Sequence, residues 1–124
     1  IEYCGIVNDK ELSEIYSGAQ ILVNLRKTDD YAMNFSFPSK LFEYLTTGTP
    51  VITTKLLNDK EFLNSVYVLE DITEKNIIKA IYAIKDNYKE YLSRAKQAKR
   101  FLINNYSFDT IALNVINYID SLVN

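Results

Sequence analysis

The chain has 124 residues, of which 14 are Lys or Arg and 16 are Asp or Glu, so its net charge of −2 at pH 7 gives no electrostatic basis for binding nucleic acid. Histidine is absent and Cys4 is the single cysteine, which excludes within this chain a histidine general base, a Ser-His-Asp triad, His- or Cys-based metal sites and an internal disulfide. The apolar runs are too short to span a membrane, the first residues lack the pattern of a signal peptide, and the length fits one domain or part of one.

The first part of the chain predicts a strand, a helix and a second strand. The run Ile1–Gly5 is typical of a short strand, and Asn8 or Asp9 can cap a helix that has Glu11 in its first turn. Ile21–Leu25 is apolar without alternation, which is typical of a strand in a parallel sheet covered on both faces. Helical spacing relates the apolar residues between the two strands, which are Leu12, Ile15, Tyr16 and Ala19.

The middle of the chain predicts a polar loop, a short helix and a buried strand. Residues 26–36 are polar and show no periodicity. Pro38 suits the first turn of a helix, Gly48 suits the left-handed residue just past a helix end, and Pro50 prevents the helix from resuming. Val51–Thr54 is then a β-prone run, so the helix leads directly into a strand.

A fourth strand completes the predicted sheet. Residues 55–65 form a second polar loop with a helical turn at Asp59–Leu63, and Val66–Leu69 is the next β-prone run. Four strands with helices between them predict an α/β fold with a doubly wound, Rossmann-like parallel sheet and right-handed crossovers. Ligands bind such sheets at the carboxyl ends of the strands, where the central helix also begins.

Three helices are predicted to form a helical C-terminal tail. Thr73 starts the first, Tyr88–Asn104 is the second, and Ser107 caps the third. Their apolar stripes are Ile77, Ile78, Ala80, Ile81 and Ile84; Tyr91, Leu92, Ala95, Ala98 and Leu102; and Ile111, Val115, Ile119 and Leu122. The second helix also carries Lys89, Arg94, Lys96, Lys99 and Arg100. We interpret these basic residues as a solvated face, with contact to an anionic membrane surface as the alternative.

The amino end of the central helix is the ligand site that the residues themselves indicate. Free N–H groups and the positive end of the helix dipole attract anions, so a diphosphate can rest on the amides from Phe37 to Leu41, with the Ser39 hydroxyl as a further donor. Glu43 lies on the same helix face as Ser39, about 5–6 Å further along, where a carboxylate can accept both vicinal hydroxyls of a ribose. A structural interpretation stays open, in which Ser39 caps the helix and Glu43 pairs with Lys40 or Thr47 in solvent.

One motif spans this helix and the strand after it. It reads Phe37-Pro38-Ser39-Lys40-Leu41-Phe42-Glu43-Tyr44-Leu45, followed by Thr47-Gly48-Thr49-Pro50-Val51-Ile52. Flanking segments are Tyr3-Cys4-Gly5-Ile6-Val7, Ile21-Leu22-Val23-Asn24 and Asn105-Tyr106-Ser107. Over nearly the whole chain this pattern resembles the C-terminal, donor-binding domain of GT-B-fold glycosyltransferases, in particular the large retaining group called glycosyltransferase family 4.

The resemblance implies that this domain binds a nucleotide diphosphate sugar. Glu43 matches the family glutamate that binds the nucleotide ribose. The residues that match the loop and helix start at the donor diphosphate and sugar are Ser36, Phe37, Pro38, Ser39, Lys40 and Leu41. The family pattern has another glutamate eight residues before the ribose glutamate, touching the hydroxyls of the donor sugar. Phe35 occupies that position here, and Asn34 and Ser36 are the neighbours that can substitute.

Three further residues are candidates beside this site. Arg26 and Lys27 begin the loop after the strand Ile21–Leu25, where a cation can balance a departing nucleoside diphosphate; ordinary loop charges are the alternative. Val7 matches the position at which the family backbone contacts the nucleotide base. The resemblance implies no metal and no cofactor, with the leaving phosphate itself assisting transfer, and it places the catalytic residues largely outside this chain.

The resemblance also gives expectations for the whole protein. We expect residues 1–124 to lack the first strand–helix units of the donor domain, to be inactive alone, to require the N-terminal domain of the same parent chain, and to self-associate through an exposed sheet edge. The acceptor is expected to be lipid-linked or a polysaccharide, in bacterial polysaccharide biosynthesis, with a location in the cytoplasm or peripherally on the inner face of the membrane. Phe35 supports a second hypothesis, a non-catalytic GT-B-like nucleotide-binding or regulatory module.

Overall fold

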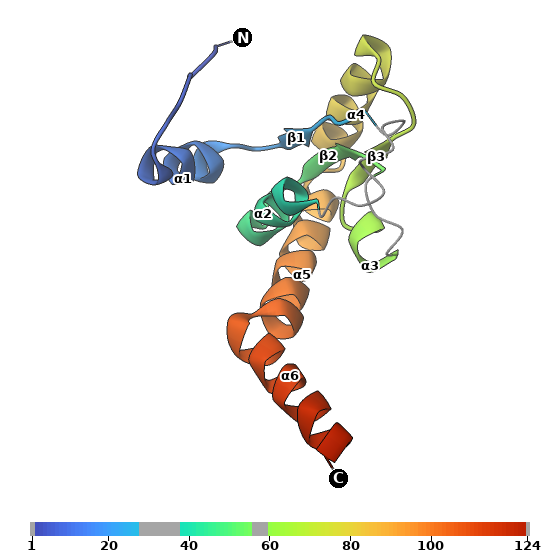
Figure 1. Ribbon diagram of the computed structural model, residues 1–124. Coiled ribbons are helices and arrows are strands. Elements are labelled where there is room, and N and C mark those ends of the chain that lie inside the picture. The colour runs from blue at the N-terminus through green and yellow to red at the C-terminus, as the bar shows by residue number, and fades with distance from the viewer. Residues whose placement is uncertain (1, 28–37, 56–59, 124) are drawn as a thin grey trace.

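The computed structural model describes residues 2–27, 38–55 and 60–123. Within these residues, three parallel strands form one sheet in the order β1-β2-β3, and helices lie on both of its sides (Figure 1). The strands are β1 (Leu22–Asn24), β2 (Val51–Thr54) and β3 (Tyr67–Leu69). In the register of the sheet, Leu22 lies opposite Val51 and Thr54 lies opposite Leu69. This α/β arrangement is compatible with a Rossmann-like domain, as the alternation of strands and helices predicts.

The predicted strand at Ile1–Gly5 is wrong for the described residues Glu2–Gly5, which form no strand. A strand satisfies its backbone only by pairing with a neighbouring strand, whereas a helix satisfies it locally. No described strand pairs with this segment, and the side chain of Tyr3 is 92% exposed. The described sheet therefore has three strands instead of four.

Two hydrophobic clusters cover the two faces of the sheet. Successive side chains of a strand point to opposite faces, so Val51 joins one cluster and Ile52 joins the other. The first cluster holds Leu41 and Leu45 of α2 (Ser39–Thr47), and the second holds Ile84 of α4 (Glu74–Asp86). All four residues of β2 are buried, as expected for the central strand of a parallel sheet covered on both faces.

Hydrogen bonds in the first turn determine where helix α1 (Asp9–Gly18) begins. The Asn8 side chain accepts a hydrogen bond of 3.0 Å from the Glu11 N–H, and the Glu11 carboxylate accepts one of 2.9 Å from the Asn8 N–H. This reciprocal pair is a capping box, and it confirms the predicted helix start. None of the residues of α1 is fully buried. The half-buried Tyr16 of α1 and the C-cap residue Ala19 pack against the core.

The helix α2 ends at Gly48, as predicted. Gly48 has φ 75° and ψ 18°, which is the left-handed conformation, and its N–H donates to the Leu45 carbonyl over 3.3 Å. A Cβ atom at this position would lie 3.3 Å from Cδ of Lys99 on α5 (Tyr88–Tyr106). Backbone conformation and close packing therefore both favour glycine here.

We expect Gly48→Ala to lower the free energy of unfolding by about 1–2 kcal/mol, because a side chain is strained in the left-handed region. Urea unfolding followed by circular dichroism measures this change. Gly18→Ala is the matched control, because Gly18 has no positive φ and a Cβ atom there would meet open space. That variant should be neutral or more stable by about 0.4–1 kcal/mol. Equal stabilities of the two variants would contradict the argument.

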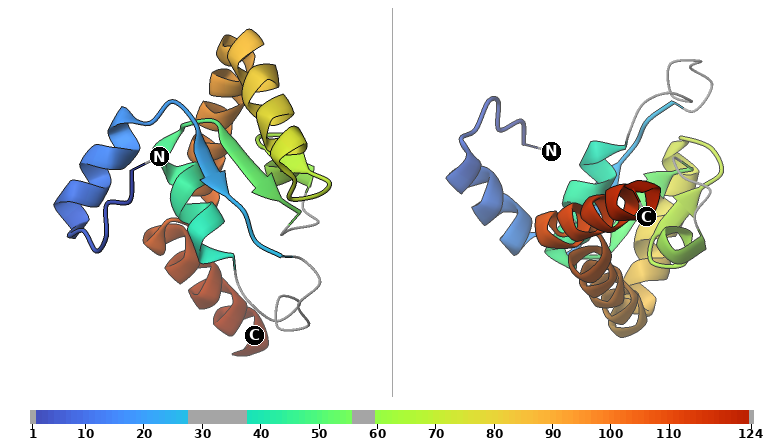
Figure 2. Two further views of the ribbon diagram at one scale, coloured as in Figure 1. Left: turned by 90° about the horizontal axis from the view of Figure 1, so that it is seen from above. Right: turned by 60° about the horizontal axis from the view of Figure 1, so that its bottom comes forward.

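The remaining helices are α3 (Lys60–Leu63), α4, α5 and α6 (Phe108–Val123). The predicted caps at Thr73 and Ser107 are confirmed, since their hydroxyls accept from the backbone N–H groups three residues later. The predicted helix at Tyr88 continues to Tyr106, and its buried residues are Ala95, Ala98 and Leu102. In α6 no side chain is buried, and the helix projects away from the sheet (Figures 1 and 2). Among the described residues, no helix is both long enough and apolar enough to cross a membrane.

Candidate functional site

The amino end of α2 lies at the carboxyl edge of the sheet. β1 and β2 are parallel, and α2 runs in the opposite direction, starting at the edge of the sheet where β1 ends (Figure 2, left). At the same edge the Arg26 N–H donates a hydrogen bond of 3.2 Å to the Thr54 hydroxyl at the end of β2. This is the edge at which parallel α/β sheets bind ligands.

The first turn of α2 offers a smaller set of amides than the sequence suggests. Pro38 occupies the N-cap position without a side-chain cap, and its carbonyl accepts from the N–H groups of Leu41 and Phe42, over 3.0 and 3.2 Å. The Leu41 side chain is buried in the core. Proline has no N–H, so within the described part of the chain the amides of Ser39 and Lys40 remain for a ligand. Ser36 and Phe37 lie outside the described residues.

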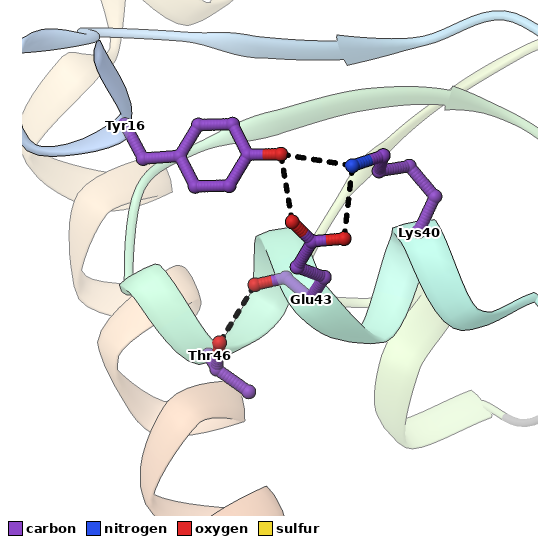
Figure 3. Close-up of polar contacts among 4 residues, drawn as sticks. All are labelled: Tyr16, Lys40, Glu43 and Thr46. Atoms are coloured by element: carbon purple, nitrogen blue, oxygen red, sulfur yellow. Dashed lines mark hydrogen bonds and ion pairs between the residues drawn. The ribbon is translucent and has the colours of Figure 1, made fainter. Parts of the chain in front are cut away.

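Three side chains from two helices form a closed ring of hydrogen bonds just inside this turn (Figure 3). The Lys40 ammonium donates to the Tyr16 hydroxyl over 3.0 Å and to Oε2 of Glu43 over 2.9 Å. The Tyr16 hydroxyl donates to Oε1 of Glu43 over 2.8 Å. Lys40 and Glu43 are one turn apart on α2, whereas Tyr16 comes from α1. The Glu43 side chain is 41% exposed, so a ligand can still reach its carboxylate.

The hydrogen bonds among Tyr16, Lys40 and Glu43 affect the pKa values of these side chains. The hydrogen bond from Lys40, together with a smaller effect of the one from Tyr16, lowers the pKa of the Glu43 carboxyl. The hydrogen bonds to Tyr16 and Glu43 raise the pKa of the Lys40 ammonium. Partial burial raises the pKa of the Tyr16 phenol. At neutral pH the site therefore holds a carboxylate, an ammonium and a neutral hydroxyl.

The ring stands beside a groove between α1 and α2 with a volume of about 570 Å³. Its walls carry carboxylates and hydroxyls around the apolar side chain of Leu12. The lining residues besides Leu12 are Asp9, Ser13, Tyr16, Ser17, Glu43, Thr46, Thr47 and Thr49. Thr46 is oriented by its own helix, because its hydroxyl donates to the Glu43 carbonyl over 2.7 Å (Figure 3). The groove therefore gives a ligand a route to Glu43 between the two helices.

The structure brings some of the predicted site residues together and leaves others apart. Glu43 pairs with Lys40, as the structural interpretation of the helix predicts. The cap predicted at Ser39 is wrong, because Pro38 is the N-cap and Ser39 is already the first residue of α2. The side chains of Arg26 and Lys27 are exposed at the carboxyl edge of β1, and neither takes part in the hydrogen bonds of the ring. Val7 is half-buried just before the start of α1, whereas Tyr16 lies near the other end of that helix. Phe35 lies outside the described residues.

Tyr16 is the site residue that sequence reasoning missed. Its helical spacing predicted a place in the apolar stripe of α1, and its ring does pack partly against the core. Its hydroxyl, however, reaches a carboxylate 27 positions later in the sequence. The one sequence feature that could have indicated this role is the tyrosine itself, because the hydroxyl of a partly buried tyrosine usually forms a hydrogen bond.

No group of three acidic or cysteine side chains within the described ranges comes close enough to hold a metal ion. In comparisons with known proteins, no curated protein and no solved structure matches this chain. A protein-family model with the description glycosyl transferase-like matches residues 1–117, which is most of the 124 residues. The chain therefore belongs to the glycosyl transferase-like family.

Proposed function

We propose that residues 1–124 are the donor-binding domain of a glycosyltransferase that moves a sugar from a nucleotide diphosphate sugar to an acceptor. The observation that carries this proposal is the position of Glu43, an accessible carboxylate one turn inside a helix that begins at the carboxyl edge of a parallel sheet. Membership of the glycosyl transferase-like family supports glycosyl transfer as the reaction class.

Glu43 has the capacity to bind the ribose of the donor. A carboxylate has about four lone-pair positions for hydrogen bonds. Tyr16 and Lys40 each occupy one, on different oxygens, which leaves about two for further donors. The two vicinal hydroxyls of a ribose supply two donors at the matching spacing. Because Lys40 already balances the charge of Glu43, an anionic diphosphate can bind nearby without strong repulsion.

The diphosphate is proposed to bind at the first turn of α2. The amides of Ser39 and Lys40 and the hydroxyl of Ser39 provide donors there, and the helix dipole favours the negative charge. The Lys40 ammonium has three N–H donors, of which the ring uses two, so one remains for a phosphate oxygen. Arg26 or Lys27 at the same edge of the sheet would add a cation for the departing nucleoside diphosphate.

The finer assignments rest on the resemblance to the GT-B-fold enzymes of glycosyltransferase family 4. These assignments are a retaining mechanism assisted by the leaving phosphate, no metal, and an acceptor that is lipid-linked or a polysaccharide. The acceptor would be held by the N-terminal domain of the parent chain. The exposed cations of α5 would allow peripheral contact with an anionic membrane surface.

Calorimetric titration of the full-length parent protein with UDP, GDP and ADP tests the donor-binding role. We expect one nucleoside diphosphate to bind, and Glu43→Ala to weaken its affinity by about 10- to 100-fold, because a hydrogen bond to a charged group contributes about 1.5–3 kcal/mol. Glu90→Ala is the matched control. Glu90 pairs with Arg94 along α5 as Glu43 pairs with Lys40 along α2, and both carboxylates are exposed.

Two results would change this proposal. If none of the three nucleotides binds, or if Glu43→Ala behaves like Glu90→Ala, the donor-binding role of Glu43 is wrong. If nucleotide binds but the parent enzyme transfers no sugar from any nucleotide sugar, the second hypothesis, a non-catalytic nucleotide-binding module, replaces the first. Phe35, where the family pattern has a glutamate, is the residue that favours that second hypothesis.

A further inference from the structure

Tyr16 is fixed between α1 and α2 by both its ring and its hydroxyl. The ring packs partly against the core and meets the Tyr44 ring edge-on, with 5.4 Å between the ring centroids. The Lys40 ammonium lies 5.7 Å from the centroid of the same ring and 5.6 Å from that of Tyr44, within the range of a cation–π contact. The hydroxyl of Tyr16 is thus delivered to Glu43 by a ring that has little freedom to move.

The partner on the same helix cannot fix Glu43 in this way. An exposed ion pair between residues one turn apart contributes only a few tenths of a kcal/mol, and the side chains of both Lys40 and Glu43 are more than two-fifths exposed. A lysine ammonium on a flexible stem also leaves the direction of the carboxylate undefined. The bond of 2.8 Å from Tyr16 to Oε1 adds a second, rigid point of attachment on the other oxygen.

Two points of attachment define the plane of the carboxylate. With Lys40 on Oε2 and Tyr16 on Oε1, the carboxylate cannot rotate without breaking one of the bonds (Figure 3). Preorganised acceptors bind more tightly because less conformational freedom is lost when the ligand arrives. The lone pairs of Oε1 and Oε2 that accept no bond from Tyr16 or Lys40 therefore point in a fixed direction.

We infer that Tyr16 is a positioning residue, which holds the Glu43 carboxylate in the orientation that accepts the two ribose hydroxyls of the donor. This inference rests on the proposed function of Glu43. It assigns to a residue of α1 a part in distinguishing ribose from sugars that lack these hydroxyls. The hydroxyl of Tyr16 acts through Glu43 and needs no contact with the ligand of its own.

Tyr16→Phe tests the inference, because it removes one oxygen and keeps the ring contacts with Tyr44 and the core. The measurement is the affinity for a nucleoside diphosphate and for its 2′,3′-dideoxy analogue, by calorimetry, in wild type and variant. We expect the affinity for the ribonucleotide to fall about 5- to 20-fold, and that for the analogue to change less than about twofold. The affinity for the ribonucleotide divided by the affinity for the dideoxy analogue should therefore fall nearly as much as the affinity for the ribonucleotide itself.

Tyr88→Phe is the matched control. The Tyr88 hydroxyl also donates one long-range hydrogen bond, of 3.3 Å to the Gln20 carbonyl. It takes no part in the hydrogen bonds that join Tyr16, Lys40 and Glu43. This variant should keep the wild-type ratio. A purely structural role of Tyr16 would lower the affinities for both nucleotides together and leave their ratio unchanged.

The outcomes separate this inference from the proposed function. If wild type binds no nucleoside diphosphate, or binds both forms equally, the ribose role of Glu43 fails and the role of Tyr16 fails with it. If wild type prefers the ribonucleotide and Tyr16→Phe keeps that preference, only the role of Tyr16 is overturned. Should the variant fail to fold, ¹³C NMR of wild-type tyrosine decides: nucleotide must shift the Cζ resonance of Tyr16 and not that of Tyr88, and an unmoved Tyr16 resonance overturns the inference.

Discussion

Replacing Leu45 with alanine is expected to lower the free energy of unfolding by about 2–5 kcal/mol. Leu45 is 1% exposed and lies on the inner face of α2, in the same cluster as Leu41, Val51 and Leu102. Truncation there removes buried methyl groups and leaves a cavity that the packed strand and helices can close only in part. Urea unfolding monitored by circular dichroism measures the loss.

Leu113→Ala is the control for this substitution. Leu113 is also a leucine inside a helix, but its side chain is 58% exposed on α6. Leucine and alanine have similar helix propensities, so the expected change is within about 0.5 kcal/mol. A loss below about 1 kcal/mol for Leu45→Ala would mean that α2 does not pack against the sheet as described. The position of Glu43 would then lose its structural basis.

On the opposite face of the sheet, Ile84→Ala should cost a similar amount, about 2–5 kcal/mol. Ile84 has no exposed surface and packs with Ile52, Leu69 and Ala80. Ala80 is too short to fill the space that the isoleucine side chain leaves. The measurement is again the free energy of unfolding from a urea titration.

Ile78→Ala is the control within the same helix. Ile78 is 45% exposed, although the spacing of apolar residues places it in the same predicted stripe as Ile84. We expect a loss below about 1 kcal/mol, because little apolar surface is removed from a buried site. Similar losses at Ile78 and Ile84 would show that α4 is rotated relative to the sheet. The pair of variants thus measures which side of α4 faces the core.

Local chemistry made much of the fold predictable. Gly48 and Pro50 stop α2 because one adopts the left-handed conformation and the other cannot continue a helix. Asn8 and Thr73 start their helices by accepting a backbone N–H. Val51–Thr54 was predicted as a buried strand, and all four of its residues are buried. The prediction that the strand within Ile21–Leu25 is covered on both faces is wrong, because β1 lies at the edge of the described sheet and Val23 is 40% exposed.

Features that depend on distant partners were predicted less well. The apolar pattern of Ile1–Gly5 fits a strand, but strand formation also needs a neighbour, and Glu2–Gly5 has none among the described strands. The predicted stripe of α4 contains five apolar residues, of which Ala80 and Ile84 are buried. No residue in the stripe of α6 is buried. Periodicity shows which face of a helix is apolar, but not whether another element covers it.

The candidate site also has one part that local sequence predicts and one part that depends on distant contacts. That Glu43 and Lys40 share one turn of a short helix could be read from the residues alone, because both positions follow from the stop at Gly48 and the period of 3.6 residues. The packing of the folded chain was needed to bring Tyr16 to them. The difference is one of range. Helix spacing and end signals act within a few residues, whereas a hydrogen bond between α1 and α2 depends on how both helices pack.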